Sequence, residues 1–289
     1  MPLTPVAVVG AFYTASERGL AADVLSARAL GLAPVPVCTS IVVASDGRVT
    51  DVTEVPVDTV LAQLEHLAGG PDVRGVKIGV LGSPKTAIAI LDAAPSLGGP
   101  VVLDIVASGP SGETVLSARG IDAVADRLGA ADLVTMSRAD AELVTGGEIT
   151  SLDDAQVAAQ RVHHRGARAV VIRCGTMPYR FYDAADDPGQ SAQGPLWADL
   201  YYDGDDFALF EAPAFEASPS GAGSAFALAA LAGLINGRPT EEALQAAKRF
   251  ATDAVRAALD VDGLEPRIGL AIPAPEPSAT PLGPARPAA

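Results

Sequence analysis

The sequence predicts an α/β fold in which a doubly wound, mostly parallel sheet carries helices on both faces. Short β-branched runs alternate with longer Ala- and Leu-rich stretches of helical period, and this alternation is typical of strand–helix–strand units. A chain of 289 residues also buries enough surface for one large core. We expect a single domain over residues 1–272. The Pro- and Ala-rich segment 273–289 has too few large apolar groups for a core, so we expect an extended or disordered tail there.

The elements follow one another in a regular order. The expected strands are residues 6–9, 36–43, 75–80, 101–106, 133–135 and 169–173, followed by a strand pair at 197–202 and 207–211. The expected helices are residues 21–30, 57–67, 85–94, 120–128, 153–165, 223–234 and 240–259. Two helices carry start signals, since Ser151 precedes one and Thr240 with two glutamates opens the last. Residues 186–195 are rich in Asp, Gly and Pro and predict an exposed loop.

Composition limits the classes of partner. The formal net charge is −15, from 35 acidic and 20 basic residues, which disfavours nucleic acid and anionic membranes because their phosphates would be repelled. No apolar run reaches the roughly 20 residues that span a bilayer, and the first residues do not read as a secretory signal. The two cysteines, Cys38 and Cys174, sit in or beside apolar runs and indicate a reducing compartment. We expect a cytoplasmic protein with small-molecule partners.

The most informative segment is Gly221-Ala222-Gly223-Ser224, which stands directly before an Ala- and Leu-rich helix. Glycines let backbone N–H groups converge, and the helix dipole adds positive potential, so the segment is suited to a phosphoryl group. The alternative is a tight loop with close helix packing and no ligand. Two other phosphate-binding motifs are missing: there is no Gly-x-x-x-x-Gly-Lys, and no Gly-x-Gly-x-x-Gly follows the first strand.

The same segment resembles the Gly-Thr-Gly-Cys of hydroxymethylpyrimidine/phosphomethylpyrimidine kinases and the Gly-Thr-Gly-Asp or Gly-Ala-Gly-Asp of their pyridoxal kinase and ribokinase relatives. Other segments match this family in its own order. Residues 77–82 are similar to Lys-Ile-Gly-Met-Leu-Gly, residues 101–104 with Ser111-Gly112 to Val-Val-Leu-Asp and its downstream Ser-Gly, residues 135–142 to Thr-Pro-Asn-Leu-Pro-Glu-Ala-Glu, and residues 170–175 to Val-Leu-Val-Lys-Gly-Gly. Residues 20–31 are similar to the family's first helix. The resemblance covers roughly residues 5–260.

The resemblance implies a ribokinase-like three-layer fold and ATP-dependent phosphorylation of the hydroxymethyl group of a small heteroaromatic vitamin precursor, in thiamine or pyridoxal metabolism. It implies ATP and Mg²⁺ as cofactors, and dimers are common among such relatives. The residues that it assigns to phosphoryl transfer are Gly221, Ala222, Gly223 and Ser224. Those that it assigns to the nucleotide are Asp104, Ser137, Asp140, Arg173 and Gly175. Those that it assigns to the acceptor substrate are Gly10, Asp23, Ala44, Val80 and Ser108. Asp140 and Glu142 are the candidate magnesium residues.

Several positions depart from the family's pattern. Ser224 stands where relatives have Cys or Asp, and an alcohol is a poor general base near neutral pH. The glycine-rich loop after the first strand is here the bulky segment 10–19, in which Phe12 or Tyr13 either stacks on a ligand or forms a packed cover. Ala44-Ser45 replaces an amide pair. The alternative function is therefore a catalytically weak or inactive ligand-binding or regulatory protein. A sugar kinase of the same superfamily fits less well, since the Asp at position 224 is missing.

Overall fold

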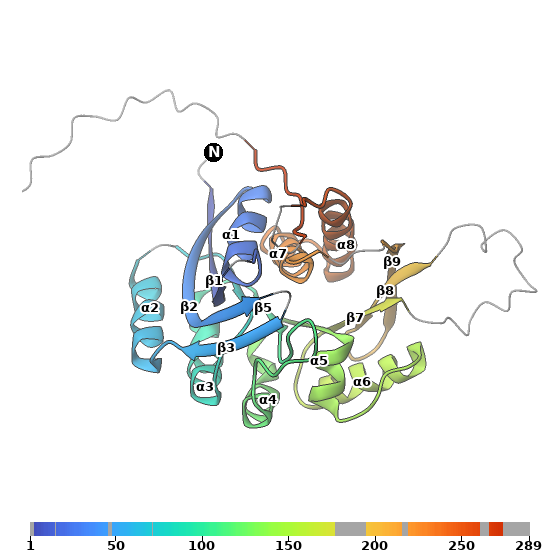
Figure 1. Cartoon of the computed structure of the whole chain (residues 1–289), viewed down its shortest axis with the longest axis horizontal. Coiled ribbons are helices and arrows are strands. Elements are labelled where there is room, and N and C mark those ends of the chain that lie inside the picture. The colour runs from blue at the N-terminus through green and yellow to red at the C-terminus, as the bar shows by residue number, and fades with distance from the viewer. Residues whose placement is uncertain are drawn as a thin grey trace, which may run out of the picture.

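The computed structural model of the chain describes residues 3–14, 16–45, 48–70, 72–176, 195–215, 219–260 and 266–273. Within them one sheet has the strand order β3-β2-β1-β4-β5-β6-β7-β8-β9, with helices on both of its faces (Figure 1). The predicted three-layer α/β fold is confirmed. The strands are β1 Thr4–Tyr13, β2 Leu32–Ser45, β3 Arg48–Glu54, β4 Val76–Ile78, β5 Val101–Ile105, β6 Leu133–Ser137, β7 Val170–Thr176, β8 Leu196–Tyr202 and β9 Phe207–Pro213. The helices are α1 Leu20–Ala29, α2 Val57–Gly69, α3 Pro84–Ala93, α4 Ala118–Ala125, α5 Arg138–Thr145, α6 Leu152–His164, α7 Ala222–Ile235 and α8 Thr240–Arg256, with 3₁₀ turns at Ala94–Leu97 and Leu128–Ala130.

The middle of the sheet is parallel and its edges are antiparallel. Strands β2, β1, β4, β5, β6 and β7 pair in parallel, whereas β3, β8 and β9 are antiparallel to their neighbours. The chain winds outward from β1 to β2 and then returns to the other side of β1 with β4. This reversal makes the carboxyl ends of β1 and β4 a topological switch point, the place where open α/β sheets bind ligands.

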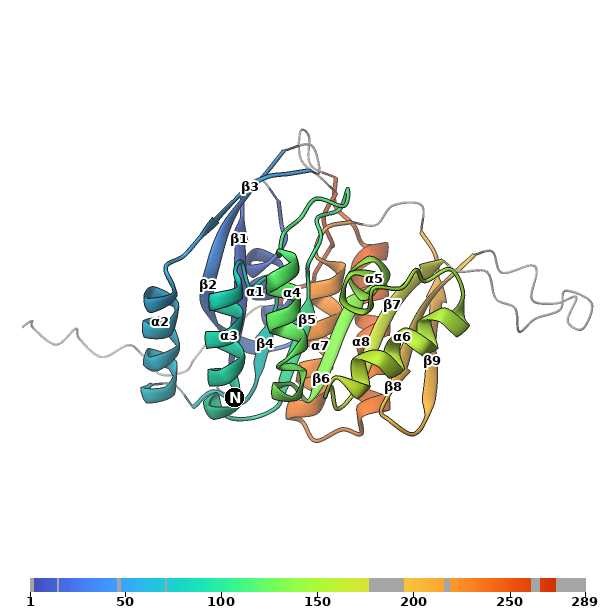
Figure 2. The same ribbon diagram turned by 90° about the horizontal axis from the view of Figure 1, so that it is seen from below.

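Each face of the sheet has its own core. On one face α2, α3, α4, α5 and α6 cover the sheet, and on the other lie α1, α7 and α8 (Figures 1 and 2). Helix α7 is buried over most of its length because its Ala and Leu side chains meet the sheet on one side and α8 on the other. A helix that is apolar on all sides is expected in such a position. Its start, at Gly221, is therefore fixed relative to the sheet.

Strands β1 and β2 continue beyond the body of the sheet and, with β3, form a flap that rises over its carboxyl edge (Figure 2). The expectation of a loop from residue 10 was wrong over its first part, because β1 runs on to Tyr13, which pairs with Val42 of β2. The pleat turns Phe12 outward, where it is 48% exposed, and buries Tyr13. Strand β3 was not predicted, since its polar edge sequence has little apolar signal.

The starts of three helices can be compared with the sequence expectations. Helix α5 was not predicted as an element; Ser137 is its N-cap, accepting a hydrogen bond from the backbone N–H of Asp140. Helix α6 begins as expected after Ser151, which forms a capping box with Asp154. Helix α8 begins at Thr240 with the acidic first turn expected, but Pro239 is the N-cap and supplies no side-chain hydrogen bond.

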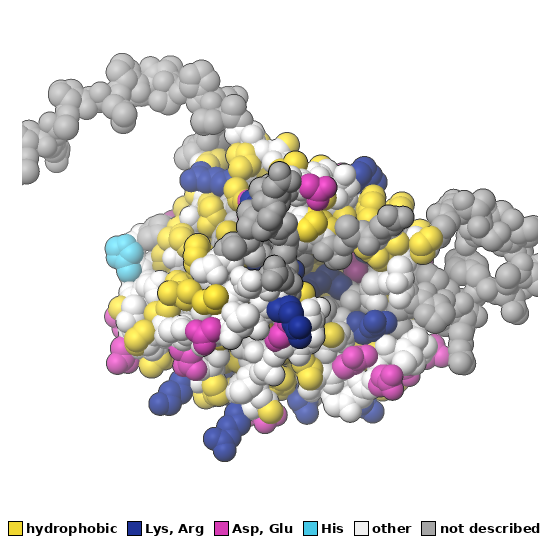
Figure 3. Space-filling model, viewed as in Figure 1, with side chains coloured by type: hydrophobic (Ala, Val, Ile, Leu, Met, Phe, Trp, Pro, Cys, Tyr) yellow, Lys and Arg dark blue, Asp and Glu magenta, His cyan; other side chains and the backbone are white. Residues whose placement is uncertain are grey.

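Some expectations fall outside the described residues, namely nearly all of the loop at 186–195 and the tail beyond residue 273. Among the described residues no helix is long and apolar enough to cross a membrane. On the face shown in Figure 3, Lys and Arg side chains are interspersed with Asp and Glu side chains rather than gathered into a basic patch.

Candidate active site

The glycine turn opens helix α7 at the carboxyl edge of the sheet. Gly221 is the N-cap in a left-handed conformation (φ 95°) and makes no side-chain hydrogen bond to the first turn. A Cβ atom at Gly221 would lie 3.1 Å from the carbonyl oxygen of Glu17 and 3.2 Å from the Cβ of Ala22, so glycine is required both for φ and for space. The first N–H groups of a helix have no partner inside it. The turn thus presents amide hydrogens and the positive end of the α7 dipole to a ligand.

A hollow of about 740 Å³ lies directly in front of this turn. Residues from the turn, from α8 and from the ends of β6, β7 and β8 line it, among them Ser137, Gly175, Trp197, Gly221, Ala222, Gly223 and Thr252. The turn forms its polar end, while Trp197, Phe226 and Val255 supply apolar surface. A cleft of this size with a few polar groups and an aromatic wall suits a small ligand that carries a ring and an anionic group.

Arg173 covers the turn from the sheet side. A Cβ at Gly223 would lie 3.0 Å from Nη2 of Arg173, so the guanidinium stands beside the backbone of the turn. Its Nη1 donates to Oδ1 of Asp104 at 2.8 Å, and the Thr135 hydroxyl donates to the same oxygen at 2.8 Å. Burial would raise the pKa of Asp104, but Arg173 and Lys77 hold it below its usual range. Asp104 therefore stays ionised and fixes Arg173 in place.

A second buried ion pair forms part of the wall of the hollow. Lys248 of α8 binds Asp199 of β8 at 2.9 Å, and both side chains are less than a tenth exposed. Burial raises the pKa of Asp199, while Lys248 and Arg173 act in the opposite direction. The sequence analysis missed both residues. The signal was there, since Lys248 falls on the buried stripe of α8 between Leu244 and Ala251.

The carboxylate of Asp140 is held by hydrogen bonds from neighbouring residues. Its Oδ1 accepts hydrogen bonds from the backbone N–H groups of Ala107 and Ser108 and from the Ser108 hydroxyl, at 2.9 to 3.0 Å. Its Oδ2 accepts a hydrogen bond from Ser137 at 2.6 Å, and a carboxylate oxygen has a second lone pair that can accept another donor. Glu142 is turned away, because its carboxylate accepts from the backbone N–H of Ile149.

Magnesium fits Asp140 better than Glu142. Among the described residues no three His, Cys, Asp or Glu side chains form a group that could hold a metal ion by themselves. Mg²⁺ bound with nucleotides uses one or two carboxylates together with waters and phosphate oxygens. The spare lone pair on Oδ2 of Asp140 suits such a role, as acceptor from a metal-bound water.

At the switch point Gly10 lies within β1, Val80 follows the end of β4, and Asp23 of α1 lies beside Gly10. A Cβ at Gly10 would lie 3.7 Å from Oδ2 of Asp23 and 3.8 Å from the backbone nitrogen of Val80. Oδ1 of Asp23 binds Nζ of Lys77 at 2.7 Å, and both side chains are almost fully buried. The alternative of a solvated Asp23 is wrong. Sequence reasoning also missed Lys77 as part of the site.

The space under the flap is filled by the protein's own side chains. Tyr13, Val42, Val80 and Val115 form a buried cluster, with Ala44, Val49 and Val52 packed against it. An ion pair between Arg48 of β3 and Glu113, at 3.5 Å, joins the flap to the loop after β5. Burial raises the pKa of Tyr13 to about 12, and its phenol lies within the electrostatic reach of Arg18 and Asp140. Of the two alternatives for Tyr13, the structure shows a packed cover.

The residues proposed from sequence thus form two neighbouring groups. Gly221, Ala222, Gly223, Ser137, Arg173 and Gly175 line the large hollow, with Asp104 and Asp140 behind them. Gly10, Asp23 and Val80 meet at the switch point, and Ala44 belongs to the β2 part of the flap and packs against the buried cluster. Ser108 does not line the large hollow and is occupied by Asp140. Ser224 stands between the groups, since its neighbours line the hollow and its hydroxyl influences Asp23.

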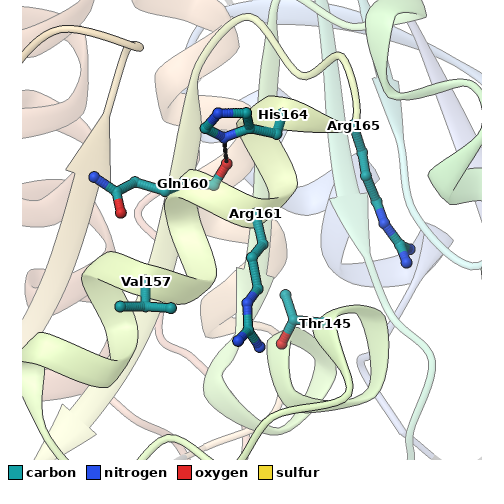
Figure 4. Close-up of a pocket in the computed structure, with 6 residues that line it drawn as sticks. All are labelled: Thr145, Val157, Gln160, Arg161, His164 and Arg165. Atoms are coloured by element: carbon teal, nitrogen blue, oxygen red, sulfur yellow. Dashed lines mark hydrogen bonds between the residues drawn. The ribbon is translucent and has the colours of Figure 1, made fainter.

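A smaller hollow of about 350 Å³ lies between α5 and α6, on the face of the sheet opposite α7. In Figure 4 the side chains of Arg161 and Thr145 approach one another across it, and His164 is bound to the carbonyl oxygen of Gln160. It contains none of the residues proposed from sequence, so it is separate from the active site.

Comparison with known proteins agrees with this geometry. A family model described as phosphomethylpyrimidine kinase matches residues 15–266. The hydroxymethylpyrimidine/phosphomethylpyrimidine kinase of Rhizobium meliloti is 32% identical over 244 residues, which are 83% of this chain and 86% of that protein. The enzyme of the same name from Aquifex aeolicus is 28% identical over 251 residues, 86% of this chain and 92% of that protein.

Solved structures share the fold. The pyridoxal kinase of Staphylococcus aureus, in complex with AMP-PCP and pyridoxal, superposes with a TM-score of 0.77 at 27% identity and covers 92% of this chain and 93% of its own. An ADP complex of Bacillus subtilis pyridoxal kinase gives a TM-score of 0.79 at 23% identity, covering 93% of this chain and 98% of its own. The latter likeness shows the fold alone.

Proposed function

The chain belongs to the phosphomethylpyrimidine kinase family, and on that premise we propose that it transfers the γ-phosphoryl group of ATP to the hydroxymethyl group of a small heteroaromatic vitamin precursor. The observation that carries the proposal is the turn at Gly221–Gly223, where the start of helix α7 and Arg173 line a hollow of about 740 Å³. The apolar end of the hollow, with Trp197, suits a nucleotide base, and the turn suits its phosphates. Relatives support the nucleotide, since the solved pyridoxal kinase of Staphylococcus aureus binds AMP-PCP or ADP.

Phosphoryl transfer depends mainly on positioning and on charge stabilisation. The amides of Ala222 and Gly223 would hold the transferring group, and Arg173, kept charged by Asp104, would offset its negative charge. When bound, Mg²⁺ would neutralise charge on the phosphate oxygens. Asp140 would orient it through a bound water. None of these contributions needs a strong base at position 224.

This preserved apparatus favours a kinase over a ligand-binding protein that lost the chemistry. Arg173 and its partner carboxylate cost desolvation energy on folding, and a cation held beside the turn would stabilise the charge that develops in phosphoryl transfer. The alternative predicts nucleotide binding without turnover.

The acceptor is expected to be a small ring with few hydrogen-bonding demands. Relatives are named for hydroxymethylpyrimidine, its phosphate and pyridoxal, but here Ala44 offers no amide and Tyr13 fills the space under the flap. A polar ring would leave its hydrogen-bonding edge unpaired in such surroundings. A homodimer and a cytoplasmic location stay predictions; sedimentation and fractionation would test them.

A coupled assay tests the proposed function. Purified protein with Mg-ATP is offered hydroxymethylpyrimidine, its monophosphate, pyridoxal and several sugars, and product is identified by mass. Phosphorylation of at least one heteroaromatic, faster than ATP hydrolysis alone, is expected. Calorimetry with AMP-PCP runs in parallel. Nucleotide binding with no product from any acceptor would instead establish a binding protein.

A further inference from the structure

The Ser224 hydroxyl hardly ionises near neutral pH and is a poor general base by itself. Its side chain nevertheless stands near a carboxylate, that of Asp23, which no part of the mechanism above uses. Asp23 is fully buried, and Lys77 occupies only its Oδ1. Among the described residues, no donor lies within ordinary hydrogen-bonding distance of Oδ2. A buried carboxylate oxygen without a partner costs free energy, so its retention calls for a functional explanation.

The orientation of this free oxygen gives that explanation. Oδ2 faces the switch point, where a Cβ at Gly10 would lie 3.7 Å from it. A Cβ at Gly221 would lie 3.2 Å from the Cβ of Ala22, so the turn that carries Ser224 packs against α1 beside Asp23, and the Ser224 hydroxyl lowers the pKa of Asp23. Catalytic hydrogen bonds often form or tighten only when substrate binds.

We propose, building on the proposed function, that Asp23 is the final proton acceptor of the reaction and that the Ser224 hydroxyl relays the proton to it. The acceptor hydroxyl attacks the γ-phosphorus of the nucleoside triphosphate, and the bond to the β,γ-bridging oxygen breaks, leaving the nucleoside diphosphate. The acceptor's proton passes to Oγ of Ser224 while the proton of Ser224 passes to Oδ2 of Asp23. The carboxylate becomes a carboxylic acid and later returns the proton to solvent.

The charges around Asp23 suit this role. Burial raises its pKa above that of an ordinary Asp, Lys77 from β4 lowers it, and the carboxylate of Asp104 from β5 raises it. A carboxylate with a raised pKa is a stronger base than a solvated one. Gly79 belongs to the same arrangement, since a Cβ there would lie 2.9 Å from Nζ of Lys77. Asp23 is a positioning residue in this scheme, because it acts through Ser224.

Variants that break the relay at either member should fail in the same way. Ser224→Ala is expected to lower kcat about 100-fold with little change in KM. Asp23→Asn alone would leave Lys77 buried without a partner, so the pair is replaced together as Asp23→Asn/Lys77→Met. That variant should lose a similar factor in kcat. Combining it with Ser224→Ala should lower kcat little further, because the effects of residues that act as a unit are not additive. Ser26→Ala is the matched control, because Ser26 is a buried serine of α1 whose hydroxyl has no hydrogen-bond partner among the described residues, and it should keep wild-type kcat.

Two further measurements separate a relay from a structural role. In wild type kcat should fall on the acid side as Asp23 takes up a proton, and this limb should vanish in Asp23→Asn/Lys77→Met. In Ser224→Cys, whose thiolate is itself a base, replacing Asp23 and Lys77 should matter less than in wild type. The relay would be overturned if the fold losses in kcat of the Ser224 and Asp23 variants multiplied in the combined variant. It would also be overturned if the fall of kcat at low pH were unchanged in Asp23→Asn/Lys77→Met.

The contact between the two residues can be tested without turnover. In protein labelled with ¹³C-aspartate, Ser224→Ala should raise the pKa of Asp23, because the hydroxyl favours the charged carboxylate. An unchanged titration overturns the relay, whatever the assay shows. Absence of product from wild type overturns the proposed function instead, so the two failures are distinguishable.

Discussion

The two halves of the active site are built differently. On the nucleotide side, charged and polar groups surround a hollow of about 740 Å³, and Arg173 and Lys248 are each held by a carboxylate. On the acceptor side, Tyr13 and aliphatic side chains pack under the flap. The nucleotide side thus offers charged and polar groups to a ligand, whereas on the acceptor side the protein's own apolar side chains occupy the space under the flap.

The largest effect is expected at Arg173, the cation of the nucleotide side. Arg173→Met should lower kcat/KM about 100- to 1000-fold, because it removes a donor aimed at the transferring group. Arg173→Lys, which introduces the lysine of the family's Val-Leu-Val-Lys-Gly-Gly segment, should keep most of the activity. Adding Asp104→Asn to Arg173→Met should restore stability but not turnover, as unfolding and coupled assays would show. A loss below tenfold in Arg173→Met would place Arg173 outside the reaction.

Next comes the ion pair in the wall of the hollow. Lys248→Met should lower the free energy of unfolding by about 3–5 kcal/mol at neutral pH, since Asp199 is left buried without a partner, whereas Lys248→Met/Asp199→Leu should be close to wild type. The folded-state pKa of Asp199 is raised, so its contribution to stability is present at low pH and lost as pH rises through that pKa. The deficit of Lys248→Met should therefore shrink on acidification. Denaturant titrations across pH test this; a pH-independent deficit would contradict it.

Tyr13 tests the acceptor side. Tyr13→Ala should cost about 3 kcal/mol of stability through the cavity that it leaves. It should also open the space under the flap, so that kcat/KM for pyridoxal or hydroxymethylpyrimidine rises relative to that for the wild type's preferred acceptor. Phe12→Ala, on the exposed side of the same strand, is the control and should change neither quantity much. Unchanged acceptor preference in Tyr13→Ala would show that the cluster does not select the substrate.

Smaller effects are expected at the glycine turn. Gly221→Ala should cost about 1–2 kcal/mol for its left-handed backbone and should weaken AMP-PCP binding about tenfold or more by shifting the amides. Gly237→Ala, at the other end of α7, has a similar φ of 69° and open space around it. It should lose stability for its backbone conformation alone, without the close contacts of Gly221 and without losing affinity. Calorimetry that finds equal affinities for both variants would contradict the role of the turn.

The smallest effect is expected at a helix cap. Ser137→Ala and Ser151→Ala each remove an N-cap and should each cost about 1 kcal/mol. Only Ser137 also donates to Asp140, so only Ser137→Ala should change the Mg²⁺ concentration at half-maximal rate. An equal shift in both variants would argue against Asp140 as the magnesium residue.

Sequence predicted the features that are written locally. Strand and helix alternation, the Ser151 cap and the Gly221–Gly223 turn all depend on neighbouring residues, and they were found. Pairs of residues that are distant in the sequence were not predicted. Lys77 and Asp23 are 54 positions apart, and no local pattern around either residue indicates that the two side chains pair. Strand β3 was missed because its pairing with β2, rather than its own composition, makes it a strand. The sequence left two alternatives for Tyr13, stacking on a ligand or packing as a cover. Only the extension of β1 to residue 13 determines that the Tyr13 side chain points to the buried face of the strand.

The most direct test of the α7 turn as the phosphate site is nuclear magnetic resonance of the backbone amides during titration with AMP-PCP. The amide signals of Ala222 and Gly223 are expected to shift strongly with AMP-PCP and hardly at all with adenosine, which lacks phosphates. If AMP-PCP binds while these two signals stay in place, the phosphates lie elsewhere and the proposed site is wrong.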